Sequence, residues 1–178
     1  MRLRALITVL CGLFNSCSKS PPMSAGKDQV RPYQVDYDQM ISLDAEALAE
    51  EGIQEAYLEI VPKLRENGIE PDSIEEMADH EAPSYSVKHR GVVYPVYDAG
   101  LGESEDQSWG RATYILFHIV NLQLDKSERK FYAFYGGNDL GGMFLSRAEF
   151  DAARRELPKK IDWPYLPTLK DEWYGQPH

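Results

Sequence analysis

The stretch 130–150, KFYAFYGGNDLGGMFLSRAEF, constrains the fold more than any other part of the chain because several local signals follow one another in it. The aromatic run 131–135 predicts a central strand that is buried on both faces. The glycine-rich loop after it can reverse the chain through positive φ angles or close backbone approach, and 143–145 then predict a short second strand. Ser146 and Glu149 fit a capping box, so a helix of about three turns should follow.

A long helix is predicted over 45–67, with Asp44 as its N-cap and Gly68 as its stop signal. Pro62 lacks the amide that would bond to the preceding turn, so we expect a kink near it. At about 100° per residue, one stripe of this helix is apolar and should face the core: Ala49, Ile53, Ala56, Tyr57, Ile60 and Leu64. The opposite stripe holds three acids and one leucine: Glu51, Glu55, Leu58 and Glu59.

The middle of the chain predicts a hairpin and a second helix. Residues 84–98 read as two strands that turn at an Arg-Gly pair. The stretch 112–124 is apolar almost all round, which favours a buried helix over a strand. One or two further helical turns are expected over 71–79, where Asp72 and Glu75 fit a capping box.

The order of these elements is helix, hairpin, helix, two strands and helix, which indicates an α+β domain. We expect a two-layer sandwich, in which an antiparallel sheet of about four strands is covered by helices on at least one face. Residues 33–178 have the length of a single domain. The last segment, 161–178, is rich in Trp, Tyr and Pro and should lie extended across the surface of that domain.

The N-terminus has the layout of a signal peptide, because two arginines precede an apolar run over 5–14 that is too short for a permanent membrane span. The run ends in Leu-Phe-Asn-Ser-Cys, which resembles the lipobox of bacterial lipoproteins, where the cysteine after a small residue becomes the lipidated N-terminus. The resemblance implies that 1–16 are removed and that Cys17 carries the lipid. Ser18, in a place where Asp would retain the protein at the inner membrane, implies the periplasmic face of the outer membrane.

Three alternatives to lipidation stay open: cleavage by ordinary signal peptidase, a plain transmembrane anchor, and a buried apolar strand. Residues 17–32 are rich in Ser, Pro, Gly, Lys and Gln, as a flexible tether between membrane and domain would be. The lipid bilayer, reached through Cys17, is therefore the first expected partner.

Acidity and cysteine content exclude several functions. The chain has 19 basic and 29 acidic residues, and removal of the signal peptide with its two arginines leaves 17 and 29, which changes the formal charge from −10 to −12. Such a surface repels nucleic acid and steers basic partners toward it. Both cysteines precede the domain, so it can hold no disulfide, thiol nucleophile, thiolate-bound zinc or iron–sulfur cluster.

The sequence predicts no cofactor, no metal site and no catalytic residues. The loop GGNDLGG at 136–142 could be an anion nest or a calcium loop, but it lacks the spacing of known calcium loops and is interpreted as a turn. Asp79, His80 and Glu81 are metal-type ligands with His89 nearby, yet consecutive residues rarely converge on one ion, and a solvated turn is favoured.

Two further motifs are also interpreted without catalysis. His118 lies on a largely apolar helix, so a hydrogen-bonded buried histidine or an interface residue is favoured over a general base. Ser127 and Lys130 match the S-x-x-K pattern of penicillin-binding enzymes, but the companion motifs of those enzymes are missing and the pattern is attributed to chance.

Two functions remain from different classes. The favoured one is a membrane-anchored envelope protein that binds or inhibits a basic protein, for example an immunity-type lipoprotein against a basic toxin. Its partner-binding surface should contain Glu51, Glu55, Leu58 and Glu59, because a leucine exposed among acids has no role in the core. The alternative is a small envelope hydrolase whose site combines Asp, Glu, His and Tyr residues without a linear motif.

Overall fold

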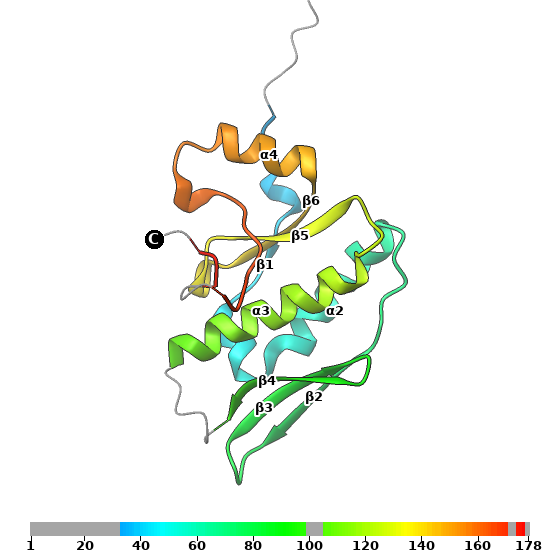
Figure 1. The fold of residues 1–178 in the computed structure, drawn as a ribbon, viewed down its shortest axis with the longest axis vertical. Coiled ribbons are helices and arrows are strands. Elements are labelled where there is room, and N and C mark those ends of the chain that lie inside the picture. The colour runs from blue at the N-terminus through cyan, green and yellow to red at the C-terminus, as the bar shows by residue number, and fades with distance from the viewer. Residues whose placement is uncertain (1–32, 99–104, 171–173, 177–178) are drawn as a thin grey trace, which may run out of the picture. The chain divides into compact units, whose positions relative to one another are not determined.

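Two antiparallel sheets of three strands each form the framework of residues 33–98, 105–170 and 174–176, the part of the chain that the computed structural model describes (Figure 1). The first sheet has the order β1 (Ile41–Ser42), β6 (Gly141–Ser146) and β5 (Arg129–Phe134). The second has the order β2 (Ile74–Asp79), β3 (Ser84–His89) and β4 (Val92–Asp98).

Helices lie between the two sheets and on the outer face of the first one (Figure 1). The layer between the sheets contains α1 (Ala45–Ala47), the turn η2 (Leu48–Gly52), α2 (Ile53–Glu66) and α3 (Glu105–Gln123). The outer helix is α4 (Arg147–Glu156). Short 3-10 turns complete the described elements: η1 (Tyr37–Gln39), η3 (Gly137–Asp139) and η4 (Lys160–Asp162).

The core is divided by the first sheet into two apolar clusters. The larger cluster joins the middle helices to strands of both sheets, with Ile60, Val87 and Phe117 among its buried members. The smaller cluster lies under α4 and consists of Tyr132, Phe134, Met143, Leu145 and Phe150. Residues on both faces of β5 are therefore buried, as the aromatic run in the sequence predicts.

The predicted α+β class, with antiparallel strands and packed helices, is confirmed. The strands are divided between two sheets, however, where the sequence predicts one sheet of about four strands, and α2 and α3 have a sheet on each side. The strand β5 is not central, because β6 separates it from β1. Its outer edge is covered at one point, where Ala133 and Tyr165 exchange backbone hydrogen bonds of 2.8 and 2.9 Å.

The predicted ends of the long helix are confirmed. The Asp44 carboxylate accepts hydrogen bonds from the first free amides of α1, those of Glu46 and Ala47. At the other end, Gly68 has a φ of 75° and the amide of Ile69 donates to the carbonyl of Leu64, which closes a Schellman turn. The capping box before α4 is confirmed as well.

The helix is interrupted in a different place from the predicted one. α2 continues through Pro62 without interruption. The break lies in η2, where Glu50 and Glu51 leave helical geometry and Glu51 has a φ of 66°. A Cβ on Gly52 would be 2.5 Å from the carbonyl oxygen of Ala47, so the chain can turn this tightly only with glycine at that position.

The hairpin is confirmed and the helical turns before it are wrong. His89 pairs with Val92, and the two residues between them have positive φ angles of 50° and 80°, as a type I′ turn requires. Residues 74–79 form β2 instead of helix and pair with β3 along its whole length. The predicted capping residue Asp72 bonds to side chains on β3 and its turn instead, as described below.

The helix predicted over 112–124 is confirmed and starts earlier, at Glu105. No helix among the described residues is long and apolar enough to cross a membrane. In the C-terminal segment, Pro164 and Tyr165 are buried rather than lying on the surface, whereas Leu166 and Leu169 are exposed. The predicted signal peptide, tether and lipid site at Cys17 lie outside the described residues.

Candidate functional site

Three of the four predicted partner-binding residues share the exposed face of α2. Glu55 and Glu59 are exposed, and Leu58 between them has 60% of its surface accessible. The opposite face of the helix is in the core, with Ile53, Tyr57, Ile60 and Leu64 all buried. The stripe assignment made from the sequence therefore holds for α2 itself.

Glu51 does not belong to that face. It lies in the interruption before α2, and its carboxylate is 3.6 Å from Nδ1 of His80. A continuous helix through Gly52 would place it with Glu55 and Glu59, but the chain leaves helical geometry at Glu50 and Glu51. The acids on the exposed face of α2 are therefore Glu55 and Glu59.

Leu58 forms one wall of a groove of about 300 Å³ between α2 and the segment that leads into β2. Tyr57, Val61, Pro71 and Ile74 give the groove an apolar lining. Its polar lining residues are Gln54, Arg65, Asp72 and Ser73. The groove thus joins the exposed leucine to an apolar depression in which a partner's side chain can be shielded from water.

The wall that carries Asp72 is held by buried hydrogen bonds. Oε1 of Gln123, on α3, accepts from the Asp72 amide at 2.8 Å, and the Tyr57 hydroxyl donates to the Asp72 carbonyl at 2.7 Å. Both backbone groups of Asp72 are therefore bonded to side chains of helices, one from α2 and one from α3. Such satisfied buried networks hold a segment in a single arrangement.

The Asp72 carboxylate bonds to the side chains of Arg90 and His89. Arg90 donates to Oδ2 at 2.6 Å and Nε2 of His89 lies 3.1 Å from the same oxygen. Partial burial opposes ionisation, but the hydrogen bonds from His89 and Arg90 outweigh it and hold the pKa of Asp72 below its usual value. The carboxylate is thus a fixed negative charge at the edge of the groove.

Asp72 and His89 form a carboxylate–histidine pair of the kind found in catalytic triads, but the geometry does not favour proton transfer between His89 and a substrate. The ring of His89 is fully buried, and its second nitrogen, Nδ1, has no hydrogen-bond partner among the described residues. A substrate cannot reach that nitrogen unless the hairpin opens. The pair therefore fits a structural role at the groove, in which Nε2–H donates to the carboxylate.

A second network fixes α2 against β2. The Glu76 carboxylate accepts from the amide of Gln54 at 2.8 Å, and the Tyr85 hydroxyl accepts from the amide of Ile53 while it donates to Glu76. Burial, and then the bond to Glu76, raise the pKa of Tyr85 far above its usual value. Side chains from the second sheet thus cap the N-terminus of α2, which has no cap of its own.

The metal-type residues of the sequence are not brought together. Asp79 closes a turn by accepting hydrogen bonds from the amides of Glu81 and Ala82, and His89 lies at the opposite end of the β2–β3 ladder. Within the described residues, no group of three or more His, Cys, Asp or Glu could hold a metal ion. His118 is stacked on Tyr114 at 5.1 Å, and burial followed by the nearby His89 lowers its pKa.

The two remaining motifs have structural contacts. Oγ of Ser127 accepts from the amide of Arg129 and Nζ of Lys130 donates to the carbonyl of Leu124, so both S-x-x-K side chains bond to backbone. In the glycine loop, Asn138 donates to the carboxylate of Glu46. These contacts agree with a structural role for the S-x-x-K residues and for the glycine loop rather than a catalytic one.

No family model matches the chain, and neither a curated protein nor a solved structure is significantly similar to it. The groove and its surroundings are therefore the features from which a function can be inferred.

The low pKa of Asp72 predicts a specific loss of stability in acid. A carboxylate with a depressed pKa in the folded state stabilises the protein above the unfolded pKa of about 3.9, and this contribution disappears as the pH falls through the folded value. Asp72→Asn should therefore lower the melting temperature at pH 6, by the equivalent of about 1 kcal/mol for a partly exposed site. The difference in melting temperature between the variant and the wild type should become smaller below about pH 4.

Asp151→Asn is the matched control for this prediction, because Asp151 makes an exposed pair with Arg147 on α4. Such a pair contributes only about 0.3 to 0.5 kcal/mol. Melting curves from pH 2.5 to 7 measure both effects. If the difference in melting temperature between Asp72→Asn and the wild type is the same at every pH, the depressed pKa of Asp72 is contradicted.

Proposed function

We propose that the chain is an envelope protein that acts by binding a basic protein partner at the face formed by Glu55, Leu58, Glu59 and the groove beside them. An immunity-type lipoprotein that neutralises a basic secreted toxin is the kind of protein that fits this description. The acidic balance of the chain favours a basic partner, since complementary charge speeds encounter and suppresses wrong partners.

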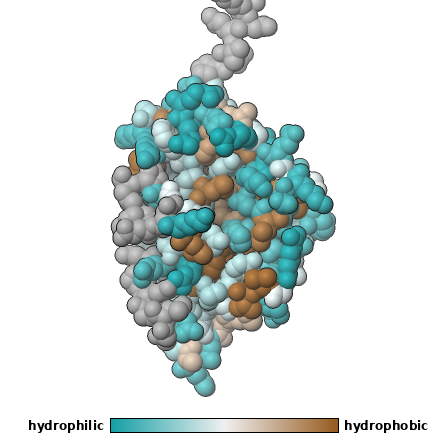
Figure 2. Space-filling view, viewed as in Figure 1, coloured by the Kyte–Doolittle hydropathy of each residue, from teal (hydrophilic) through white to brown (hydrophobic). Residues whose placement is uncertain are grey.

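The observation that carries the proposal is the position of Leu58. On the face seen in Figure 2, hydrophobic residues reach the surface in separate areas among hydrophilic ones, which is ordinary for a soluble surface and has no functional meaning by itself. Leu58 differs because it is 60% exposed, shares its helix face with the exposed acids Glu55 and Glu59, and borders a 300 Å³ groove with an apolar lining. This combination of an apolar centre and a charged rim is typical of a protein-binding site.

The test is a photo-crosslinking residue placed at Leu58 in the full chain, with the same residue at Val93 as the control. Val93 is 51% exposed on β4, so both positions are open to solvent. Position 58 should capture a defined protein of high isoelectric point that position 93 does not capture. Equal capture at both positions would refute this face as the binding surface. A protein that captures nothing but hydrolyses an ester, peptide or glycan would favour the hydrolase alternative.

Membrane attachment through Cys17 is part of the same proposal. Its support is the signal-peptide layout and the Ser-Cys end of the apolar run. Cys17→Ser should move the protein from the membrane pellet to the soluble envelope fraction, because the lipid would have no attachment site. A wild-type protein that is already soluble on fractionation, and that carries no lipid by mass spectrometry, would refute the anchor.

A further inference from the structure

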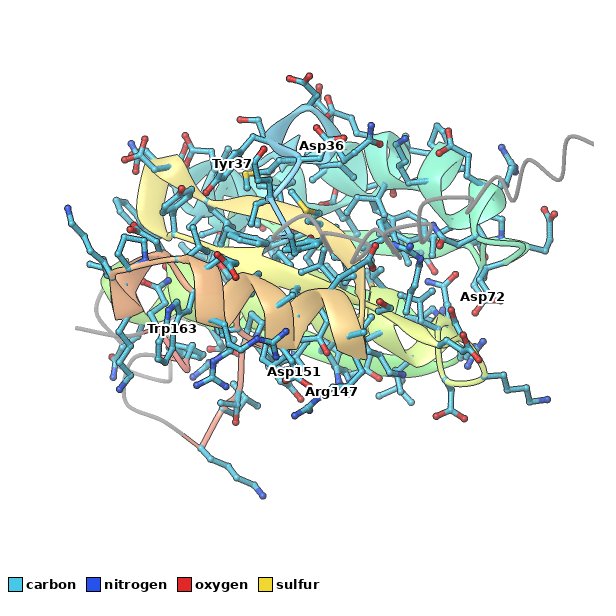
Figure 3. All side chains as sticks on the ribbon, turned by 90° about the horizontal axis from the view of Figure 1, so that it is seen from above. Asp36, Tyr37, Asp72, Arg147, Asp151 and Trp163 are labelled. Atoms are coloured by element: carbon cyan, nitrogen blue, oxygen red, sulfur yellow. The ribbon has the colours of Figure 1, made fainter. Side chains whose placement is uncertain are left out.

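A second pocket lies between α4 and the segment that follows η4, away from the groove. Its volume is about 270 Å³, and its lining includes Phe150, Trp163, Tyr165 and Leu166 together with the cations Arg154 and Lys160. In Figure 3, Trp163 and Asp72 lie at opposite sides of the domain, so this pocket and the groove are separate sites. The size is just below the roughly 300 to 1,000 Å³ of ordinary small-molecule sites.

The position of Arg154 is the main observation. Its guanidinium carbon is 4.6 Å from the ring centre of Trp163 and 5.4 Å from that of Phe150. Among the described residues, no carboxylate lies within ion-pair distance of Arg154 or of Lys160. By contrast, Arg147, which also lies over Phe150, bonds to Asp151 at 2.9 Å.

The aromatic wall of the pocket is itself fixed. The indole N–H of Trp163 donates to the carbonyl of Leu157 at 3.0 Å, and the Tyr165 hydroxyl donates to the carbonyl of Tyr135 at 2.7 Å. The polar atoms of both rings are therefore satisfied, which leaves apolar ring surface for a ligand. A ring held in this way loses little conformational entropy when a ligand binds.

This part of the chain is less acidic than the whole. Residues 147–178 contain six basic and six acidic side chains, whereas the complete chain has a formal charge of −10. The guanidinium between two rings has a restricted orientation, and its N–H donors match the geometry of a carboxylate. The pocket therefore combines an anion-binding group with a flat apolar surface.

We propose that this pocket binds a small carboxylate ligand with a flat apolar body, of about the size of an aromatic amino acid. Its carboxylate bonds to Arg154 and Lys160, and its apolar body packs on Trp163, Tyr165 and Leu166. This site does not depend on the protein-binding function, since the two surfaces share no lining residue.

A matched pair of probes tests the proposal on the wild-type chain: N-acetyl-phenylalanine and its neutral amide. Titrations are followed by calorimetry and by the NMR signals of the tryptophan indole N–H groups. The carboxylate should bind at least about tenfold more tightly than the amide, which is the ratio expected for one charged hydrogen bond. Equal affinity of the two probes, or no binding of either, would overturn the proposal.

Variants locate the site. Arg154→Gln and Lys160→Gln should each reduce the affinity for the carboxylate toward that for the amide, whereas Arg155→Gln should not, because Arg155 is an exposed neighbour outside the pocket. Equal losses in all three variants would mean general electrostatic attraction and would also overturn the proposal. Vesicles that contain phosphatidylglycerol form the last arm: if they bind the chain while the carboxylate probe does not, the segment contacts membrane and the pocket is no ligand site.

Discussion

Replacing Gly142 by alanine is expected to destabilise the fold by about 1 to 3 kcal/mol, which corresponds to a fall of roughly 3 to 10 °C in melting temperature. Gly142 lies in β6, the middle strand of its sheet, and pairs with residues on both neighbours. A Cβ at this position would be 2.1 Å from Cζ of Phe131. The ring cannot move away easily, because it is fully buried and packs on Phe117 at 4.6 Å and Phe144 at 4.8 Å.

The control is Gly137→Ala in the same glycine-rich loop. Gly137 has a φ of 59° and no atom within 4 Å of an added Cβ, so its substitution costs only backbone strain of roughly 1 kcal/mol. A smaller side chain at the clash, Phe131→Leu, should cost less in the Gly142→Ala background than in the wild type, because the two residues compete for one space. Thermal melts of the wild type, the three single variants and the double variant measure these effects, and a Gly142→Ala protein that melts with the wild type would refute the steric account.

The glycine loop illustrates how far local sequence signals reach. The sequence predicts positive φ or close backbone approach for its glycines, and both occur, but at different positions. Gly137 has the positive φ, whereas Gly141 and Gly142 lie in extended strand against Met40 and Phe131. Which glycine serves which purpose depends on partners that are distant in the sequence.

The predictions that the structure confirms are those encoded within a few residues. The Asp44 cap, the Ser146–Glu149 capping box and the two-residue hairpin turn each need only neighbouring groups. Asp72 and Glu75 have the same capping-box spacing, yet β2 forms there. In this case Asp72 bonds to His89 and Arg90, 17 and 18 residues away, and a local pattern cannot predict such partners.

The candidate sites also depend on contacts between residues that are distant in the sequence. Helical phase alone identifies Leu58 as exposed, but the groove beside it exists because 71–74 returns to lie along α2. The sequence predicts Glu51 on the same face because the tight approach of Gly52 to Ala47 has no signal beyond a single glycine. The pocket at Arg154 has no local sequence signal either, because the chain must leave α4 and pass through η4 before Trp163 lies over the Arg154 guanidinium.

Charge reversal on α2 should have the largest effect on partner binding. Glu55→Lys with Glu59→Lys is expected to slow association with the partner captured at Leu58 by at least about tenfold at low salt, because electrostatic steering raises association rates by roughly 10 to 1,000-fold. The fold should stay intact, since both side chains are exposed and helix charge pairs contribute only about 0.2 to 0.5 kcal/mol each. The difference from the wild type should shrink near 0.5 M salt, where the Debye length falls to roughly 4 Å.

Leu58→Ala should change the dissociation rate constant rather than the association rate constant. Loss of an apolar anchor mainly speeds dissociation, and a cost of about 2 kcal/mol corresponds to roughly thirtyfold in affinity with little dependence on salt. The control for charge is Glu156→Lys with Asp162→Lys, which changes the net charge by the same amount at α4 and η4, on the far side of the first sheet from α2 (Figure 1). Surface plasmon resonance at several salt concentrations separates the cases. If the Glu156→Lys/Asp162→Lys control slows association as much as the α2 double variant, net charge alone is responsible for the effect. If, in addition, Leu58→Ala leaves the dissociation rate unchanged, the α2 face is not the binding surface.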